Sequence, residues 1–468
     1  NRSMNMINVR RLAVMTFLGA GMLSDISAQD FSLQADTLNE ARLPAQWDLQ
    51  SCIDYALEQN ITIRKNRVTA ESTQIDVKTA KAALFPSLSF STSQQVVNRP
   101  YQETSSRVSG SEIISSNSKT SYNGNYGLNA SWTIYNGSKR LKTLKQERLN
   151  NQVAELDVAT SENTIKESIA QIYIQILYAA ESVRVNENTL QVSIAQRDRG
   201  QELLNAGSIA KSDFAQLEAQ VSTDRYQLVT AQATLQDYKL QLKQLLELDG
   251  ENEMNVYLPN LSDENVLAPL PAKKDVYVSA LAIRPEIEAS KLNVEVSELG
   301  IDIAKSSYFP TVSLSAGIGT NHTSGSDFTF GEQVKNGWNN SIGLSVSVPI
   351  FNNRQTKSAV QKARLQRETN MLSLLDEQKA LYKTIESLWL DANSAQQRYA
   401  AANEKLRSTQ ISYDLISEQF NLGMKNTVEL LTEKNNLLQA QQEQLQAKYM
   451  AILNTQLLKF YQGDKLTL

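Results

Sequence analysis

The sequence of 468 residues contains one cysteine, Cys52, and one histidine, His322. A single cysteine excludes a disulfide framework within the chain, and a single histidine without a cysteine cluster argues against a zinc or other transition-metal site. No GxSxG motif or phosphate-binding glycine loop occurs, so we expect neither an enzyme nor a bound cofactor. The formal net charge is −4 and the basic residues are scattered, so nucleic acid is not an expected partner.

Long apolar runs are also scarce. The run from Leu12 to Leu23 falls far short of the roughly 20 residues that a membrane-spanning helix needs, and no later segment approaches that length. Arg10 and Arg11 precede this run, and Ile26-Ser27-Ala28 follows it as a suitable cleavage site. We therefore expect residues 1–28 to be a secretory signal peptide and the mature chain to be exported without a transmembrane helix. Cys52 is expected to be an ordinary buried residue.

The chain repeats itself. AKAALFPSLSFSTS at 80–93 is nearly repeated by AKSSYFPTVSLSAG at 304–317, an offset of 224 residues. Farther along, the offset becomes 216 residues, as between Gly207 and Gly423. A hairpin loop of different length explains the change, because surface loops tolerate insertions. Each repeat reads as helix, strand, loop, strand, long helix, glycine turn and helix.

This pattern predicts two structural repeats, 29–247 and 285–468, joined by a linker at 248–284. The expected strands are 86–101, 121–135, 310–322 and 338–350, the long helices are 137–203 and 352–420, and the return helices are 210–247 and 427–461. No proline interrupts the chain from Asn136 to Asn205 or from Asn352 to Asn421. Each long helix can therefore have about 67 residues and a length of roughly 100 Å.

Apolar residues alternate with small uncharged residues in the expected strands, as in SIGLSVS at 341–347. Such strands fit either a soluble sheet or a membrane barrel with lipid outside and water inside. The secretion signal and the aromatic residues Tyr122, Trp132 and Trp338 near strand ends favour the barrel. The segments 102–119 and 323–337, rich in Ser, Asn and Gly, are expected to be exposed hairpin tips, with His322 in such a loop.

The long helices carry heptad patterns. In the second repeat the apolar positions step by three and four along the helix, at Ile385, Leu388, Ala392, Ala395, Tyr399, Ala402 and Leu406. The final helix has two adjacent apolar stripes, which indicates a partner helix on each side. A solvent-exposed coiled-coil hairpin uses the same pattern. An exported coiled-coil scaffold or adhesin with a soluble β region therefore stays open as an alternative function.

Four strands cannot lie alone in a membrane, because unpaired strand edges are not tolerated in hydrocarbon. Two copies of the chain would give eight strands, whose interior side chains fill, whereas three copies give twelve and begin to leave a lumen. The small polar face of the strands suggests a lumen. We therefore expect a homotrimer that shares one barrel in contact with outer-membrane lipid.

Several short motifs, in this order and twice over, resemble the TolC family of trimeric outer-membrane efflux ducts. They are Ala56-Leu57 with Asn60, the strand starts Phe85-Pro86 and Phe309-Pro310, Ile134-Tyr135-Asn136-Gly137 with Ile350-Phe351-Asn352, and the turns Gly207–Asp213 and Gly423–Glu429. WDLQSCIDYALEQNI at 47–61 is similar to the opening of Bacteroidetes members. The resemblance covers essentially the whole mature chain.

The resemblance implies an α+β membrane protein: a trimer whose 12-stranded β-barrel is continued into the periplasm by a 12-helix α-barrel, with 248–284 and the C-terminal end in an equatorial belt. It implies a passive outer-membrane channel of a tripartite efflux or type I secretion system. The implied partners are a periplasmic adaptor and an inner-membrane pump of the RND or ABC type.

The two glycine turns are the candidate gate. Gly207 and Gly423 each follow a long helix, and Asp213 and Glu429 lie in the first turn of the next helix, where an acid favours the helix dipole. In a threefold tube these acids would also form two acidic rings at the periplasmic mouth.

The resemblance further implies that an acid in the first turn bonds a Tyr and an Arg of the second to hold the entrance closed. The matching residues here are Asp213, Phe420 and Lys425; Phe420 lacks the hydroxyl, and Lys425 cannot make the bidentate pairing of an arginine. Glu429 matches the inner acidic ring of the family. Thr432 takes the second ring position, with Glu433 beside it.

Overall fold

The computed structural model describes residues 44–101, 105–109, 112–116, 119–249, 254–259, 266–324, 326 and 328–467. The chain divides into two units, Asn1–Trp47 and Asp48–Leu468, and the helices and strands given below all belong to the second. The signal peptide expected at 1–28 lies outside the described residues. Within the described ranges, no helix combines the length and the apolar character that crossing a membrane requires.

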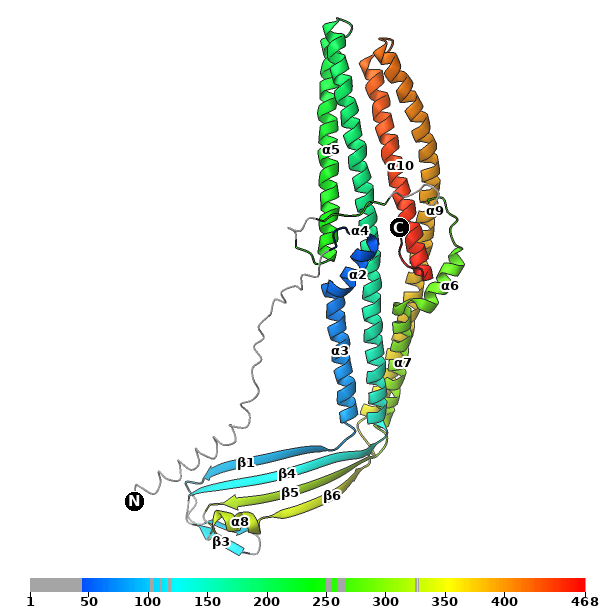
Figure 1. Cartoon of the computed structure of the whole chain (residues 1–468). Coiled ribbons are helices and arrows are strands. Elements are labelled where there is room, and N and C mark those ends of the chain that lie inside the picture. Colours follow the sequence, from blue (N-terminus) through cyan, green and yellow to red (C-terminus); the bar gives the residue numbers. More distant parts are fainter. Residues whose placement is uncertain are drawn as a thin grey trace, which may run out of the picture. The chain divides into compact units, whose positions relative to one another are not determined.

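The two repeats contain corresponding elements in the same order (Figure 1). The first comprises α2 (Leu49–Gln59), α3 (Ile61–Ala82), β1 (Ser87–Asn98), β4 (Thr120–Asn136), α4 (Lys139–Asn205) and α5 (Lys211–Leu245). The second comprises α6 (Lys273–Ile283), α7 (Pro285–Ser306), β5 (Thr311–Thr323), β6 (Asn339–Ser347), α9 (Gln355–Asn421) and α10 (Thr427–Gln462). Between the strands, the first repeat adds the hairpin β2 (Ser105–Ser109) and β3 (Glu112–Ser116), and the second adds α8 (Phe330–Asn336).

The repeat is geometrical as well as sequential. Helices α4 and α9 each have 67 residues, and both their first and their last residues are 216 positions apart. The same offset relates Ser138 and Arg354, which precede these helices in the left-handed region with φ of 63° and 65°. The predicted length of the two long helices is confirmed. Strands lie at one end of Asp48–Leu468, and the turns α4–α5 and α9–α10 lie at the other (Figure 1).

The four long strands form an antiparallel sheet in the order β1-β4-β5-β6. Its register is repeated too: Leu88 pairs with Ala130 as Val312 pairs with Val346, positions related by the offsets of 224 and 216. A β-bulge after Thr133 interrupts the alternation in β4. Within the described chain, β1 and β6 each have a neighbouring strand on one side only.

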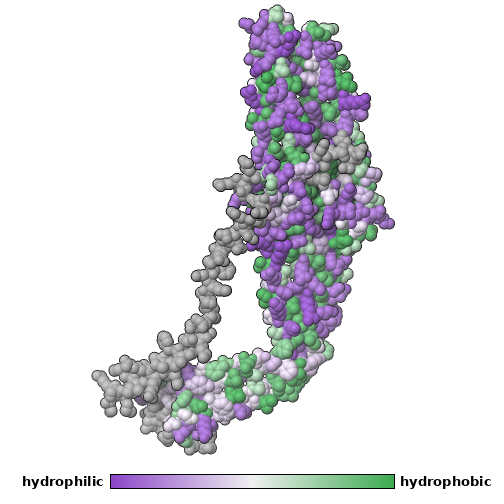
Figure 2. Space-filling view, in the orientation of Figure 1, coloured by the Kyte–Doolittle hydropathy of each residue, from purple (hydrophilic) through white to green (hydrophobic). Residues whose placement is uncertain are grey.

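The exposed surface of this sheet carries large apolar side chains, which Figure 2 shows as green and pale atoms with few purple ones. The exposed set includes Leu88, Phe90, Val96, Ile342, Leu344 and Val346. Ser, Gly and Asn occupy the alternate positions, so the sheet has one apolar face and one small polar face. The long helices instead expose a mixture of polar and apolar residues (Figure 2).

The segment 323–337 connects β5 to β6, as predicted for a hairpin tip, but it is not irregular throughout. The segment 323–337 contains helix α8, which begins at a capping box formed by Thr329 and Glu332. His322 lies in β5 rather than in a loop, and its ring packs 5.0 Å from that of Phe330 and 5.2 Å from that of Tyr122. Gly124, opposite His322 on β4, leaves room for the imidazole, since an added Cβ there would collide with the ring.

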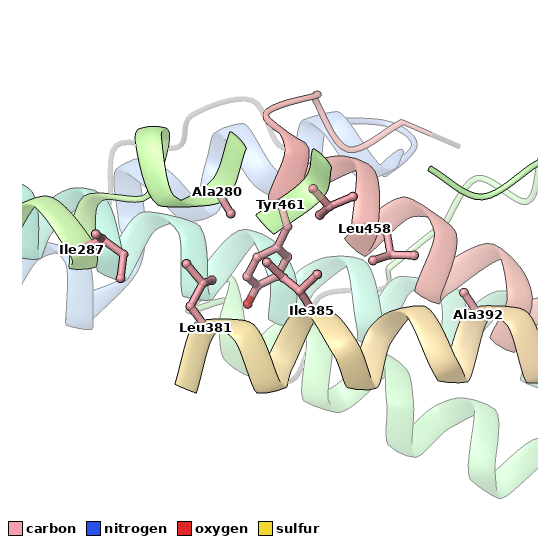
Figure 3. Packing of buried hydrophobic residues seen from close by; sticks show 8 residues of the cluster. Ala280, Ile287, Leu381, Ile385, Ala392, Leu458 and Tyr461 are labelled. Atoms are coloured by element: carbon pink, nitrogen blue, oxygen red, sulfur yellow. The ribbon is translucent and has the colours of Figure 1, made fainter. Parts of the chain in front are cut away.

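One hydrophobic cluster of the helical part lies where α6, α7, α9 and α10 meet (Figure 3). The buried residues of this cluster are Val276, Ala280, Ile287, Leu381, Ile385, Ala392, Leu458 and Tyr461. Ile385 and Ala392 belong to the predicted heptad stripe, which therefore faces the core. Cys52 is buried as predicted, and desolvation raises the pKa of its thiol to about 12, so the thiol is unreactive at neutral pH.

The described part of the linker lies against both long helices. Tyr173 of α4 donates its hydroxyl to the carbonyl oxygen of Tyr257 at 2.6 Å, and Trp389 of α9 donates its indole N–H to Pro271 at 3.0 Å. Gln396, also on α9, donates to the carbonyl oxygen of Val266 at 2.9 Å. The linker is thus attached through its backbone to α4 and α9, at positions in the middle of each helix.

Candidate gate at the helical tips

The turns that follow α4 and α9 have the same hydrogen-bonded geometry. In the first, Gly207 N donates to Leu204 O at 3.0 Å and Ser208 N donates to Leu203 O at 2.8 Å. This pair of bonds is the Schellman motif, and an equivalent pair closes the turn at Gly423. The glycines have φ of 71° and 74°, which residues with a Cβ rarely adopt. The backbone conformation therefore favours glycine at both positions.

The two predicted acids cap the helices that leave these turns. A carboxylate oxygen of Asp213 accepts the backbone N–H of Ala210 at 3.2 Å. Glu429 accepts the backbone N–H of Asn426 at 3.2 Å, and the Asn426 side chain accepts the backbone N–H of Glu429 at 2.9 Å. Both carboxylates thus lie in the first turn of a helix, where the free N–H groups and the helix dipole favour negative charge.

Lys425, the cation of the second turn, pairs with a carboxylate of the helix that follows it. Lys425 Nζ lies 2.6 Å from Glu429 Oε1, an ion pair with spacing i, i+4. The hydrogen bond from Lys425, followed by that from the Asn426 backbone, holds the pKa of Glu429 below its usual range. Within this chain Lys425 is therefore paired with Glu429, whereas the sequence analysis pointed to Asp213. Phe420, the other expected member of the link, is buried near the end of α9.

We call α4–α5 the first hairpin and α9–α10 the second hairpin. The remaining predicted residues make contacts within the second hairpin. Thr432 donates its hydroxyl to Val428 O at 2.7 Å, on its own helix. Glu433 accepts a hydrogen bond of 3.0 Å from Ser412 on α9. Glu433 therefore connects α10 to α9, whereas Glu429 lies at the turn itself.

A buried polar cluster near the helical tips was not predicted. Lys434 of α10 forms an ion pair with Asp224 of α5 and donates to Ser193 of α4, and the side chains of Lys434 and Asp224 are 3% and 2% exposed. Gln220 donates to the other oxygen of Asp224 at 2.9 Å. Desolvation lowers the pKa of Lys434, and the hydrogen bond and charge of Asp224 oppose this shift. The cluster joins the first hairpin to the second.

The sequence contained a signal for this cluster. Leu217, Val221 and Leu228 follow the three- and four-residue steps of a heptad stripe, and Asp224 occupies the core position between the last two. A carboxylate at a core position demands a buried partner. Asp224 was not predicted as a buried residue because only the apolar members of the stripe were assigned to the core.

The two Phe-Pro pairs lie where a helix ends and a strand begins. Pro86 and Pro310 immediately precede β1 and β5, and the side chains of Phe85 and Phe309 are more than half exposed. Trp132 donates its indole N–H to Leu84 O at 2.9 Å, so β4 is attached to the same junction. Exposed aromatic rings beside an apolar sheet are typical of a membrane–water boundary.

The sequence profile of the outer membrane efflux protein family matches residues 52–247 and 276–463, which are the two repeats. The chain belongs to this family. Membership places it in the outer membrane, and the sheet and long helices are the family's elements. The unmatched residues 248–275 are those of the linker and the start of α6.

Relatives in the family are distant in sequence. The outer membrane protein TolC of Escherichia coli is 24% identical over 341 residues, which are 70% of this chain and 66% of TolC. The outer membrane efflux protein BepC of Brucella suis is 24% identical over 294 residues, which are 62% of this chain and 61% of BepC. The chain thus spans less than two thirds of the length of either relative.

Solved structures agree more completely in fold. The outer membrane protein VceC from Vibrio cholerae superposes with a TM-score of 0.73 over 90% of this chain and 97% of VceC, at 16% identity. The CusC structure superposes with a TM-score of 0.76 over 90% of this chain and 93% of CusC, at 18% identity. The likeness therefore extends over the sheet as well as the long helices.

Proposed function

We propose that the protein is a passive exit duct: three copies enclose one channel that crosses the outer membrane through the strands and continues through the periplasm within the helices. The observation that carries this proposal is the sheet β1-β4-β5-β6, which has one apolar face, one small polar face and two edges without a partner in the described chain. Hydrocarbon tolerates such edges only in a closed barrel. Three copies contribute twelve strands, enough to leave a lumen.

The internal repeat indicates how the copies join. β6 corresponds to β4 and β1 corresponds to β5, so the pairing of β4 with β5 is the pattern for β6 with β1 of the next copy. Ala130 pairs with Ala316 within the chain. The offsets of 216 and 224 convert this pair to Val346 and Thr92. We therefore propose that Val346 of one copy lies opposite Thr92 of the next, which closes the barrel without a new kind of contact.

The duct ends at the helical tips, and we propose that these turns form a gate. Threefold symmetry brings three copies of Asp213 and three of Glu429 around the axis, and rings of carboxylates select cations and narrow an entrance. Lys425 partly neutralises Glu429 in each copy, so Asp213 carries more of the uncompensated charge. A link from Phe420 or Lys425 to Asp213 would have to form between copies or in another state of the gate.

A duct of this kind needs partners that supply energy and cargo. We propose a periplasmic adaptor that docks at the tips and an inner-membrane pump of the RND or ABC type. The pump selects the cargo and the duct hydrolyses nothing. Distant relatives carry names that refer to efflux, to toxin and drug export and to alkaline protease secretion, so family membership is compatible with several cargoes.

The proposal is tested with purified protein in detergent and in liposomes. We expect sedimentation as a trimer, migration in SDS gels that changes on heating, and release of small sugars from liposomes that contain the protein. Fractionation with soluble periplasmic proteins and sedimentation as a monomer would instead support the coiled-coil scaffold. Liposomes that hold inserted trimers and retain small sugars, both with the native protein and with Asp213→Ala/Glu429→Ala, would contradict the duct.

A further inference from the structure

Within one chain, α10 covers a groove between α4 and α5. Leu438 and Gln442 of α10 line this groove together with Ser182, Asn186, Gln227, Thr230, Ala231 and Thr234 of the first hairpin. Ser182 Oγ and Gln442 Oε1 are hydrogen-bonded at 3.1 Å. This contact and the buried cluster of Lys434 are two of the contacts that hold the second hairpin against the first.

The second hairpin has the same groove, uncovered. Advancing the six groove residues of the first hairpin by 216 positions gives Arg398, Ala402, Glu443, Gln446, Ala447 and Met450, and all six line a groove of about 440 Å³ between α9 and α10. Met450, in its wall, is 46% exposed. The described chain offers no third helix to this groove, because α10 itself forms one of its sides.

The residues that would cover the groove can be read from the same offset. Leu438 and Gln442 correspond to Ser222 and Tyr226 on α5, both on its surface. Tyr226 is 70% exposed and Val229, three residues farther along α5, is 59% exposed, so this surface of α5 has large side chains that no part of the described chain covers. We propose that α5 of one copy docks in the α9–α10 groove of the next, with Tyr226 against Arg398. This inference rests on the trimer of the proposed function.

The chemistry of the pair supports this assignment. Inside the chain the two positions hold Ser182 and Gln442, which share a neutral hydrogen bond. At the proposed joint both change together, to Arg398 and Tyr226, and a guanidinium group packs favourably on the face of a tyrosine ring. A small polar pair is thus replaced by a larger one.

The joint within the chain, where α10 covers the α4–α5 groove, differs in one respect from the proposed joint between copies, where α5 covers the α9–α10 groove. The difference affects how easily the hairpins separate. Ser193, Asp224 and Lys434 lock the joint within the chain, and their counterparts at the joint between copies are Thr409, Ala440 and Glu218. An alanine cannot replace the buried carboxylate, so no equivalent ion pair forms. The interface between copies therefore lacks the buried cluster that penalises separation within the chain, and we expect the hairpins of neighbouring copies to separate more easily than the two hairpins of one chain.

Cross-linking tests the placement. In the variant Tyr226→Cys/Arg398→Cys, a short bifunctional thiol reagent should link copies covalently up to the trimer, whereas Tyr226→Cys/Ala400→Cys should react at least about tenfold more slowly. Ala400 is exposed and lies two residues from Arg398, on the opposite side of α9. The native Cys52 is buried and does not compete. Equal rates for the two variants, in protein that still sediments as a trimer, would overturn the proposed contact and leave the duct intact.

A pair exchange tests the chemistry. Tyr226→Gln and Arg398→Ser should each lower the temperature at which trimers dissociate, and the double variant, which installs the pair found within the chain, should recover at least about half of the combined loss. Losses that simply add would show that the two residues do not meet. A native protein that never forms trimers would contradict the proposed function as well, so the two failures are distinguishable.

Discussion

Lys434 and Asp224 show how a single residue pair fixes the arrangement of whole helices. Both side chains are almost fully removed from water, which costs several kcal/mol per ion, and the ion pair and the hydrogen bonds to Ser193 and Gln220 offset that cost. Such a cluster adds little net stability compared with apolar packing, but it penalises any arrangement that separates its members. It therefore determines the register of α10 on α4 and α5.

Removing one member should be far worse than removing both. Lys434→Met leaves the Asp224 carboxylate buried without its cation, and we expect the free energy of unfolding to fall by about 3–5 kcal/mol. The double variant Asp224→Leu/Lys434→Met should regain most of this loss, because apolar packing replaces the pair. Denaturant unfolding of the purified protein measures both. A double variant as unstable as Lys434→Met would show that the packing, and not the isolated charge, sets the penalty.

The carboxylate of Glu429 should make the second turn sensitive to acid. Its pKa is lowered in the folded chain, so its stabilising effect is complete above the ordinary pKa of about 4.5 and is lost as the pH falls through the lower folded value. At neutral pH the midpoint temperature of thermal unfolding should therefore be higher for the native chain than for Glu429→Gln, and this difference should vanish under acid conditions. The midpoints of both proteins across this range provide the measurement. A constant difference at all pH values would contradict the assignment.

Among the elements, the two Schellman turns are the points where the backbone constrains the sequence most. No atom lies within 4 Å of a Cβ added at Gly207 or Gly423, so the penalty for alanine comes from the positive φ alone. We expect Gly207→Ala and Gly423→Ala each to destabilise the protein by about 1 kcal/mol.

Gly331 is the matched control for this prediction. It also has no atom near an added Cβ, but it lies in helix α8 with an ordinary φ, so Gly331→Ala should be neutral or slightly stabilising. Thermal unfolding of the three variants compares them directly. Equal effects at all three positions would contradict the view that backbone conformation selects glycine at the tips.

Much of this element pattern could be predicted from the sequence, because long-range repetition and heptad spacing carry it. The lengths of α4 and α9 followed from the absence of proline. Strand ends were less accurate: β1 ends at Asn98 and β6 at Ser347, both shortly before a proline that lacks the N–H needed for pairing. Helix α8 was missed, although its capping box was readable.

The details of the candidate gate could not be predicted in the same way. Lys425 lies four residues before Glu429, so this local carboxylate competes with Asp213, which is distant in the sequence. The sequence alone does not show which of the two carboxylates Lys425 pairs with. The cluster of Lys434 required three helices from both repeats to be placed together. Heptad spacing identifies a buried position, but it does not identify the partner across the interface.

At the scale of the whole molecule, the spatial relation between the first and the second repeat also relates the second repeat to the first repeat of the next copy in the proposed trimer. The step from the first repeat to the second, repeated across copies, extends the sheet from β6 to the next β1 and extends the ring of helices from the α9–α10 groove to the next α5. Three chains then supply six similar units around one axis. Within each chain the buried ion pair of Lys434 and Asp224 holds the two hairpins together, and no such pair forms between chains. An opening that widens the tips should therefore separate hairpins of neighbouring chains.

Single-channel conductance of the purified protein in a planar lipid bilayer tests the central claim most directly. We predict discrete, cation-selective openings, with selectivity reduced in Asp213→Ala and Glu429→Ala and reduced further in the double variant, because the acidic rings set the charge of the entrance. Inserted trimers that conduct in neither the native form nor the double variant would contradict the duct. Openings with unchanged selectivity in every variant would show that the entrance lies elsewhere than at the helical tips.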